Sequence, residues 1–266
     1  MPAIAQTKKT YRSKAAGDRD YYEIDGVPMV RVTRVLGVMA SLALERWKIN
    51  QNREQVIDVA CDVYDAFRKT EPADRSSVGF RAVILDWLGD ARRDEQKASR
   101  AADKGKLVHS YIQTLLNREL GAIEPLPDIA PELLAGVEQW KQWREAVGMK
   151  PRFVEFTVHH PDYGYAGTTD CVGEIGGQLW IMDWKTTTGI YPNHKVQIAS
   201  YAKAYQAMGH EGVVGGRCIL IPTPKEGKSM PAFADVVADN GEIEELWSVF
   251  RACLHIYKWQ NSTGGK

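Results

Sequence analysis

The feature that most constrains this chain is the pair Gly176-Gly177, which separates two runs of β-type composition, Tyr165–Ile175 and Gln178–Lys185. Such a pair favours a two-residue hairpin turn, because glycine readily adopts the positive φ angles that a type I′ turn requires. If these two glycines form the turn, counting outward along both strands places Asp170 directly opposite Asp183.

Two carboxylates that face each other on one surface of a sheet repel, so the pair needs a compensating positive charge. Their Cβ atoms would be about 4.5–5.5 Å apart, and at that separation both can share one divalent cation such as Mg²⁺ or Mn²⁺. Because side chains alternate along a strand, Lys185 lies on the same face as Asp183. Two acids, a metal ion and an ammonium group suit phosphodiester hydrolysis, in which the metal activates a water and the lysine stabilises the developing negative charge.

The same residues also fit a solvent-exposed hairpin that carries ordinary surface charges. Against that interpretation, the second strand contains Trp180, Ile181, Met182 and Trp184, which is too apolar for a solvated edge. We therefore expect Asp183 to be partly buried, and the pattern favours a functional site.

Apolar periodicity predicts the order of elements in the rest of the chain. A hairpin with a type I′ turn at Asp25-Gly26 is expected over Tyr21–Val30, followed by helices and then by a β-β-β-α-β-β-α pattern. The predicted helices are Leu42–Lys69, Val78–Leu88, Ala98–Leu120, Pro131–Val147, Asn193–Met208 and Gly241–Gln260. The predicted strands are Arg152–His160, Tyr165–Ile175, Gln178–Lys185, Val213–Ile221 and Ala232–Ala238. The fold class is therefore α/β, with a central sheet flanked by helices and a helical N-terminal section.

Composition excludes several classes of protein. With 44% hydrophobic and 26% charged residues, the chain has ordinary globular composition. No stretch approaches the roughly 18 consecutive apolar residues of a membrane span, and no apolar signal segment is present, so we expect a cytoplasmic protein without a membrane partner. Basic and acidic residues number 34 each, so any surface that binds nucleic acid must be local.

No linker divides the chain cleanly, so we predict one domain over 21–260. Within it, 21–147 form the hairpin and the helical section, and 148–260 form the sheet core. The basic segment 1–20 is predicted to be a disordered tail, with a nucleic-acid-binding arm or a weak imitation of a transit peptide as the alternatives. Residues 261–266 are predicted to be a second disordered tail.

Three short motifs follow one another in the order strand, strand, helix: Gly167-x-x-Asp170, Asp183-Trp184-Lys185 and Gln197-x-x-x-Tyr201. Together they resemble the motifs of the PD-(D/E)xK nuclease superfamily, and within it those of the RecB-like exonuclease group. The resemblance extends over nearly the whole chain, because Val32-Thr33-x-Val35-Leu36 is similar to the N-terminal segment of phage and mitochondrial genome-maintenance relatives. It implies a restriction-endonuclease-like mixed sheet flanked by helices.

The resemblance also implies roles for single residues. Asp170, Asp183 and Lys185 would be catalytic, and Gln197 and Tyr201 would orient the lysine or contact a DNA phosphate. The candidate metal ligands are His109, Asp170, Asp183, Glu155 and the carbonyl of Trp184.

The residues by themselves leave other interpretations of these accessory positions open. His109 shares a helical face with Gly105, Ile112 and Leu116, and a lone histidine on such a face is more often a core residue than a ligand. Glu155 is either a ligand or an exposed side chain, on the face opposite to Val154, Phe156 and Val158. Gln197 and Tyr201, one helical turn apart, also fit a polar patch beside a packing tyrosine.

Some members of the RecB-like group hold an iron–sulfur cluster on one upstream and three clustered C-terminal cysteines. In this chain Cys61, Cys171, Cys218 and Cys253 are scattered, so we predict no iron–sulfur cluster. The expected cofactor is Mg²⁺ or Mn²⁺.

Basic side chains precede His109, and four of them are candidate nucleic-acid contacts: Arg93, Arg100, Lys104 and Lys106. Such a run can guide phosphates toward a metal site. Acidic residues interrupt it, so a solvated helix face is an equal alternative. Trp140, Trp143 and Trp184 are candidates for stacking on unpaired bases, although most tryptophans fill cores.

The predicted function is that of a metal-dependent DNA exonuclease that acts on single-stranded ends in phage or bacterial DNA recombination, repair or replication. Helices before the sheet can cover the site, and a narrow passage admits a single strand more easily than a stiff duplex. The alternatives are a structure-specific endonuclease on the same fold and a catalytically silent DNA-binding module. DNA is the expected partner, with a recombination or single-strand-binding protein as a further candidate.

Overall fold

The computed structural model describes residues 21–39, 102–224 and 229–262. The chain divides into two compact units, one of Met1–Met39 with Lys104–Lys266 and one of Ala40–Asp103. The single domain predicted over 21–260 stays a prediction, because residues 40–101, most of the second unit, lie outside the described residues. The fold described below is that of the first unit.

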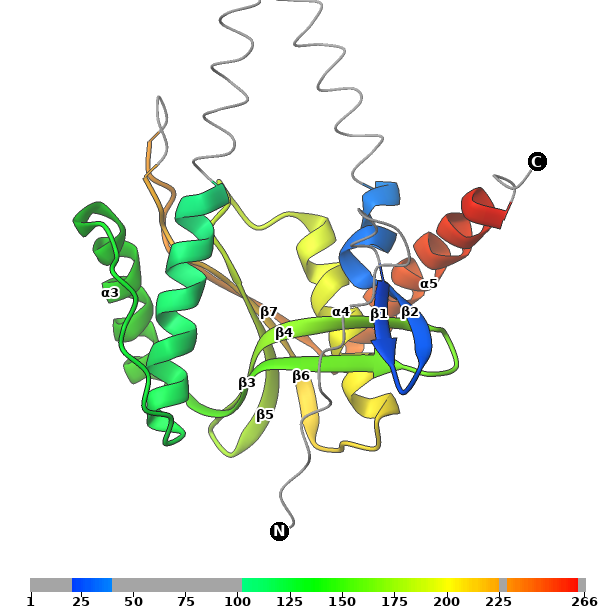
Figure 1. Ribbon diagram of the computed structural model, residues 1–266, viewed down its shortest axis with the longest axis horizontal. Coiled ribbons are helices and arrows are strands. Elements are labelled where there is room, and N and C mark those ends of the chain that lie inside the picture. The colour runs from blue at the N-terminus through cyan, green and yellow to red at the C-terminus, as the bar shows by residue number, and fades with distance from the viewer. Residues whose placement is uncertain (1–20, 40–101, 225–228, 263–266) are drawn as a thin grey trace, which may run out of the picture. The chain divides into compact units, whose positions relative to one another are not determined.

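A mixed sheet of seven strands forms the centre of this unit (Figure 1). Its strands are β1 Tyr21–Ile24, β2 Val27–Arg31, β3 Lys150–His160, β4 Tyr165–Ile175, β5 Gln178–Lys185, β6 Val213–Leu220 and β7 Ala234–Asp239. They lie in the order β1-β2-β4-β5-β6-β7, and β3 pairs with β4. The pairs β2/β4 and β5/β6 are parallel, and the other pairs are antiparallel. The predicted α/β class with a mixed sheet is confirmed, whereas the restriction-endonuclease-like assignment stays a prediction.

Helices cover both faces of the sheet (Figure 1). The helices α4 (Pro192–Ala207) and α5 (Asn240–Ser262), with helical residues 32–39, pack on one face through side chains such as Ile198 and Phe250. Helical residues 104–119 and α3 (Pro131–Val147) pack on the other face through side chains that include Ile112 and Trp140. The central strands β4 and β5 therefore contribute side chains to two separate apolar cores.

Both predicted two-residue hairpin turns are present. Asp25 and Gly26 have φ angles of 49° and 79°, and Gly176 and Gly177 have φ angles of 59° and 78°. Positive φ at both central residues is the signature of a type I′ turn. The register of each hairpin follows from its turn, because Ile24 pairs with Val27 and Ile175 pairs with Gln178.

Local sequence signals also explain where the helices begin and end. α3 and α4 each begin with a proline, which loses no hydrogen bond at a first helical position. Gly148 ends α3 in the left-handed conformation, at φ 63°. At the start of α4, the backbone N–H of Tyr191 donates to Nδ1 of His194 over 3.2 Å, which satisfies a donor that the helix leaves unpaired.

The elements β4, β5 and α3 have the predicted bounds, and the ends of β3, β6, β7, α4 and α5 differ from the predicted ones by at most two residues. At the C-terminus, two residues of the predicted disordered tail 261–266 are helical instead, because α5 continues to Ser262. Asn261 Nδ2 donates to the carbonyl of Tyr257 over 2.7 Å, which supports this last turn. The predicted basic tail 1–20 and the helices predicted over 42–69 and 78–88 lie outside the described residues.

The strand β3 does not alternate regularly, because Glu155 in its middle has a positive φ of 49°. Val154 packs in the core beneath α3, whereas Phe156 and Val158 pack in the core beneath α4. The prediction that Val154, Phe156 and Val158 share one face is therefore wrong. Composition cannot show this change of face, because a single dihedral angle produces it.

In the part of the chain that the structure describes, no helix combines the length and the apolarity needed to cross a membrane.

Candidate active site

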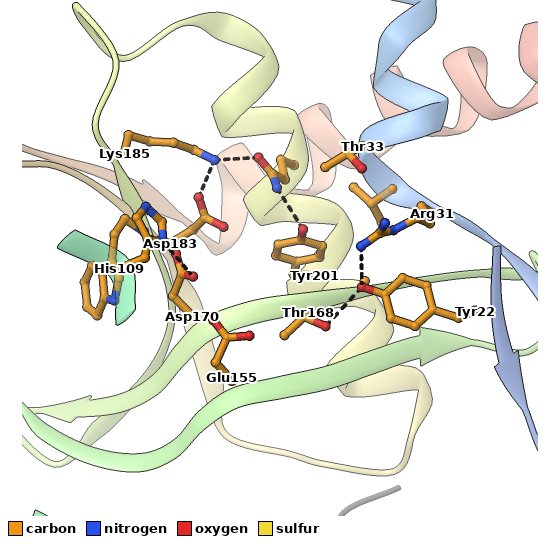
Figure 2. A pocket seen from close by; sticks show the side chains of 14 residues that line it. Tyr22, Arg31, Thr33, His109, Glu155, Thr168, Asp170, Asp183, Lys185 and Tyr201 are labelled. Atoms are coloured by element: carbon orange, nitrogen blue, oxygen red, sulfur yellow. Dashed lines mark hydrogen bonds and ion pairs between the residues drawn. The ribbon is translucent and has the colours of Figure 1, made fainter. Parts of the chain in front are cut away.

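The candidate site lies where β4 lacks a neighbour along part of one edge. β3 occupies the first edge of β4. On the second edge, β2 pairs with β4 as far as Ala166, and β5 pairs with it from Cys171 onward. Among the described strands, none pairs with residues 167–170 on this edge, and a cavity of about 300 Å³ opens there (Figure 2).

The two predicted acids meet at this cavity. β4 and β5 pair in the register expected from the Gly176-Gly177 turn, and their last pair toward the cavity is Cys171 with Met182. One further step in the same register places Asp170 across from Asp183, and both line the cavity. The predicted hairpin register is therefore confirmed.

Asp170 is held by two donors from different elements. His109 Nδ1 lies 3.3 Å from Asp170 Oδ1, and the backbone N–H of Trp184 donates to Asp170 Oδ2 over 2.6 Å. Burial alone would raise the pKa of Asp170, but the charge and hydrogen bond of His109 outweigh it, so the pKa is lowered. Burial lowers the pKa of His109, but Asp170 reverses this effect and leaves the pKa raised.

Asp183 lies deeper and forms an ion pair with Lys185. Its side chain is 6% exposed, that of Lys185 is 14% exposed, and Lys185 Nζ contacts Asp183 Oδ2. Burial raises the pKa of Asp183, Lys185 offsets only part of this effect, and repulsion from Asp170 adds to it. For Lys185, burial lowers the pKa, but the attraction of Asp183 leaves it raised. The site thus holds a carboxylate whose charge is costly to bury, next to a lysine that stays protonated.

Lys185 is also tied to α4 through a chain of hydrogen bonds (Figure 2). Lys185 Nζ donates to Gln197 Oε1 over 2.7 Å, and Gln197 Nε2 donates to the Tyr201 hydroxyl over 2.7 Å. Gln197 and Tyr201 lie one turn apart, so they project from the same side of the helix. Burial keeps the pKa of Tyr201 well above its ordinary value, so its phenol stays protonated. This geometry agrees with a role for both residues in orienting the lysine.

Two glycines let the surrounding elements approach this cluster. A Cβ at Gly167 would lie 2.3 Å from Cε1 of Tyr201, so only glycine leaves room for the ring against β4. A Cβ at Gly105 would lie 2.5 Å from Oγ1 of Thr186, the residue that follows Lys185. Gly105 therefore allows its helix to approach the end of β5 closely.

His109 extends from the same helix toward the acids. The helical face predicted from Gly105, Ile112 and Leu116 is present, since all three are buried against the sheet. The His109 side chain is 31% exposed and lines the cavity, where it contacts Asp170. It is therefore a site residue in contact with an acid, rather than a histidine enclosed in the core.

Glu155 also lines the cavity, from the opposite edge of β4. Its neighbours Val154 and Phe156 pair with Cys171 and Thr169, so the same register places Glu155 across from Asp170. A positive φ is rare for a residue with a side chain and costs about 1–3 kcal/mol. Such strain is found most often at functional sites, and here it occurs beside an acid of the candidate site.

The predicted nucleic-acid contacts receive little support from the described residues. Arg93 and Arg100 lie outside the described ranges. Lys104 lies 3.5 Å from Glu132 of α3 in an ion pair, and Lys106 is exposed. Neither lysine lines the cavity, so their role in binding nucleic acid stays a prediction.

The tryptophans proposed to stack on bases are mainly structural. Trp140 is fully buried and Trp184 is 2% exposed, and their rings are in edge-to-face contact at 5.7 Å. Trp143 packs against Trp184 at 6.3 Å and donates its indole N–H to Asp235 over 2.9 Å. The stacking prediction is therefore wrong for Trp140 and Trp184, because the α3 core encloses both indole rings.

Asp170 and Asp183 suit a divalent ion by their chemistry, since both are carboxylates in one register at the same cavity. Asp183 Oδ2 is buried and contacts Lys185 Nζ without a hydrogen bond of good geometry, so a bound cation would share this oxygen with the ammonium group. Within residues 21–39, 102–224 and 229–262, however, no three His, Cys, Asp or Glu side chains converge as a metal-holding group. The full ligand set of His109, Asp170, Asp183, Glu155 and the Trp184 carbonyl therefore stays a prediction.

Comparison with known proteins gives one sequence match of moderate length. Over 107 residues, 38% of this chain, the sequence is 29% identical to Mitochondrial genome maintenance exonuclease 1 of Xenopus tropicalis. The match spans 30% of that protein's length, less than a third of it. No protein-family model matches the chain. A solved structure titled "Crystal structure of SSO0001" has a TM-score of 0.26 and 11% identity, over 45% of this chain and 57% of that one, which is too little to assign a fold family.

Sequence reasoning missed the residues that the N-terminal hairpin brings to the cavity. Tyr22, Arg31 and Thr33 line it together with Thr168 of β4. The hairpin itself was predicted, but its parallel pairing with the start of β4 was not. The segment that includes Thr33 was noted only for its resemblance to known exonucleases, which was the one available signal.

Proposed function

We propose that this protein is a metal-dependent deoxyribonuclease that hydrolyses phosphodiester bonds. The observation that carries the proposal is the arrangement of Asp170, Asp183 and Lys185 around one cavity. The sequence match to a protein named as an exonuclease supports the same class of activity. The PD-(D/E)xK and RecB-like assignment belongs to this proposal.

In the proposed reaction, Asp170 and Asp183 would hold one Mg²⁺ or Mn²⁺ ion, with His109, Glu155 and the Trp184 carbonyl as further candidate ligands. The bound ion would supply an activated water and stabilise charge on the phosphate. Lys185 contributes a fixed positive charge, because Asp183 and Gln197 hold its ammonium group in place. A hydrogen-bonded ammonium in a partly buried cavity stabilises a developing negative charge more strongly than one in water.

The proposed mode of attack is exonucleolytic, from single-stranded ends, within DNA recombination, repair or replication of a phage or bacterium. This mode rests on the motif resemblance and on the name of the matched protein. A structure-specific endonuclease on the same site is the second candidate. The three intact site residues favour either nuclease over a catalytically silent DNA-binding module.

The proposal is tested with end-labelled linear single strands, duplexes and covalently closed single-stranded circles, each with Mg²⁺, Mn²⁺ or EDTA. We expect metal-dependent degradation of linear single strands and survival of the circles. Cleavage of circles at the same rate would replace the exonuclease with the endonuclease. Cleavage that persists in EDTA would overturn the metal requirement.

The matched variant is Asp183→Asn, which removes charge without changing side-chain volume. We expect it to abolish cleavage, and we expect Mg²⁺ or Mn²⁺ to raise the melting temperature of the natural chain but not that of the variant, because a bound ion stabilises the folded state. Cleavage at the natural rate by Asp183→Asn would refute the site assignment.

A further inference from the structure

The end of the cavity away from Lys185 is built by the N-terminal hairpin. β2 reaches it because Val30 and Arg31 pair in parallel with Tyr165 and Ala166 at the start of β4. In Figure 2, Arg31 and Tyr22 lie on one side of Tyr201, and the acids with Lys185 lie on the other side. One cavity thus joins the proposed catalytic cluster to a second group of polar side chains.

This second group is connected by its own contacts. The Tyr22 hydroxyl lies 3.0 Å from Thr168 Oγ1, and Arg31 Nη2 donates to the Tyr22 hydroxyl over 3.5 Å. The guanidinium carbon of Arg31 lies 5.1 Å from the centre of the Tyr22 ring, so the side chain also stacks on that ring. Tyr22 itself is only 5% exposed. A buried aromatic side chain therefore positions a permanent positive charge at the cavity.

The chemistry of this group suits an anion that carries several oxygen atoms. An arginine guanidinium has five N–H donors in a rigid fork whose geometry matches the oxygen atoms of a phosphate, and Arg31 lines the cavity. Thr168 and the exposed Thr33 add hydroxyl donors. Thr33 also lies in the first turn of helical residues 32–39, where backbone N–H groups and the helix dipole favour negative charge.

We propose that Arg31, Thr33, Tyr22 and Thr168 form a subsite that binds a phosphate of the nucleic-acid strand whose neighbouring bond is hydrolysed at Asp170 and Asp183. This inference rests on the proposed nuclease function, which it deepens by naming how the strand is held. The ligand is a phosphate group, either an internal diester or a terminal monoester. A cavity of about 300 Å³ is within the range of pockets that hold small ligands.

The test measures binding of short single-stranded oligonucleotides by fluorescence anisotropy, without metal, in the natural chain, Arg31→Gln and Arg31→Lys. We expect Arg31→Gln to weaken binding about tenfold, because hydrogen bonds to a charged group are lost. Its slope of log K against log salt should be smaller by about 0.7, the value for one phosphate contact on a single strand. Arg31→Lys keeps the charge but loses the fork, so its affinity should be intermediate.

The matched control is Arg152→Gln, which also removes one arginine. Arg152 is exposed on β3, forms an ion pair with Glu174 and does not line the cavity. Its affinity should stay within twofold of that of the natural chain. Thr33→Val provides a second variant that leaves the Arg31–Tyr22 contact in place, should Arg31→Gln melt at a lower temperature. We expect it to weaken binding about threefold.

Oligonucleotides with a 5′-phosphate, a 3′-phosphate or hydroxyls at both ends distinguish the two sources of phosphate. An effect of Arg31→Gln confined to one phosphorylated end identifies a terminal monoester, and an equal effect on all three identifies an internal diester. Equal affinity of Arg31→Gln and Arg152→Gln would overturn the subsite. If Asp183→Asn still abolishes cleavage in that case, the proposed function stands, whereas a natural chain that neither binds nor cleaves these strands overturns both.

Discussion

Gly167 of β4 and Tyr201 of α4 are in such close contact that a Cβ at position 167 would lie 2.3 Å from Cε1 of the tyrosine ring. The ring is held there by tight packing, and its hydroxyl accepts the hydrogen bond from Gln197. Gln197 in turn accepts a hydrogen bond from Lys185. The absence of a Cβ at Gly167 therefore influences the position of Lys185 through Tyr201 and Gln197.

Gly167→Ala should therefore lower both stability and activity. The added methyl group forces the Tyr201 ring to move, and overpacking of this kind costs about 1–3 kcal/mol in the free energy of unfolding. Urea unfolding and cleavage of a labelled strand measure the two effects. Gly189→Ala is the control, because an added Cβ there has no atom within 4 Å and its φ is not positive. Equal stability of the two variants would contradict the packing argument.

Removing the acceptor of Lys185 should slow turnover more than it weakens substrate binding. Gln197→Met keeps a similar length but cannot accept the hydrogen bond of Lys185 Nζ, and such a bond to a charged group contributes about 1.5–3 kcal/mol. We expect kcat to fall by about tenfold or more, with KM within about threefold. Tyr201→Phe keeps the Lys185 bond and should have a smaller effect. A rise in KM at unchanged kcat would instead indicate that Gln197 contacts the DNA.

Local signals were sufficient to predict much of the fold. The end of β4 and the start of β5 follow from the Gly176-Gly177 turn, and the two ends of α3 follow from Pro131 and Gly148, because each of these signals acts locally. The same turn predicted that Asp170 faces Asp183. By contrast, the parallel pairing of β2 with β4 joins residues far apart in the sequence, and no local pattern encodes it.

The candidate site was predictable where it depends on a turn or on one helical face, as for Lys185, His109 and Gln197. It was not predictable where it depends on long-range pairing or on a single unusual dihedral angle. Arg31 reaches the cavity only because β2 and β5 share one edge of β4. The change of face in β3 arises from the φ of Glu155, which its composition does not reveal.

At Glu155, glycine should be a better replacement than alanine. Alanine would keep the strain of a positive φ, whereas glycine adopts φ 49° at no steric cost. We expect Glu155→Gly to be more stable than Glu155→Ala by about 1 kcal/mol in urea unfolding. At Arg152, an exposed position of the same strand, the order should be reversed. Both Glu155 variants lack the carboxylate, so equal losses of metal-dependent cleavage would support the role of Glu155 as a ligand. If glycine were more stable than alanine at Arg152 as well as at Glu155, the strain argument would be contradicted.

The start of α4 should make stability depend on pH through His194. Burial, with a smaller contribution from Lys185, lowers the pKa of His194 to about 4, and its Nδ1 must stay unprotonated to accept the Tyr191 N–H. Between pH 4 and the ordinary value near 6.5, the unfolded chain binds this proton and the folded chain does not. The contribution of His194 to the free energy of unfolding is therefore fully present above pH 6.5, and it is lost as the pH falls toward 4.

This contribution can be isolated with His194→Gln, because the glutamine carbonyl can still accept a hydrogen bond from the first turn but does not titrate. A pKa difference of this size corresponds to about 2 kcal/mol between pH 7 and pH 5. Urea unfolding at several pH values should show the natural chain losing about that much more stability than the variant over this interval. His159 and His160, whose pKa values burial also lowers, are present in both proteins, so their contributions cancel in the difference. Parallel pH profiles for the two proteins would show that Nδ1 of His194 does not control the start of this helix.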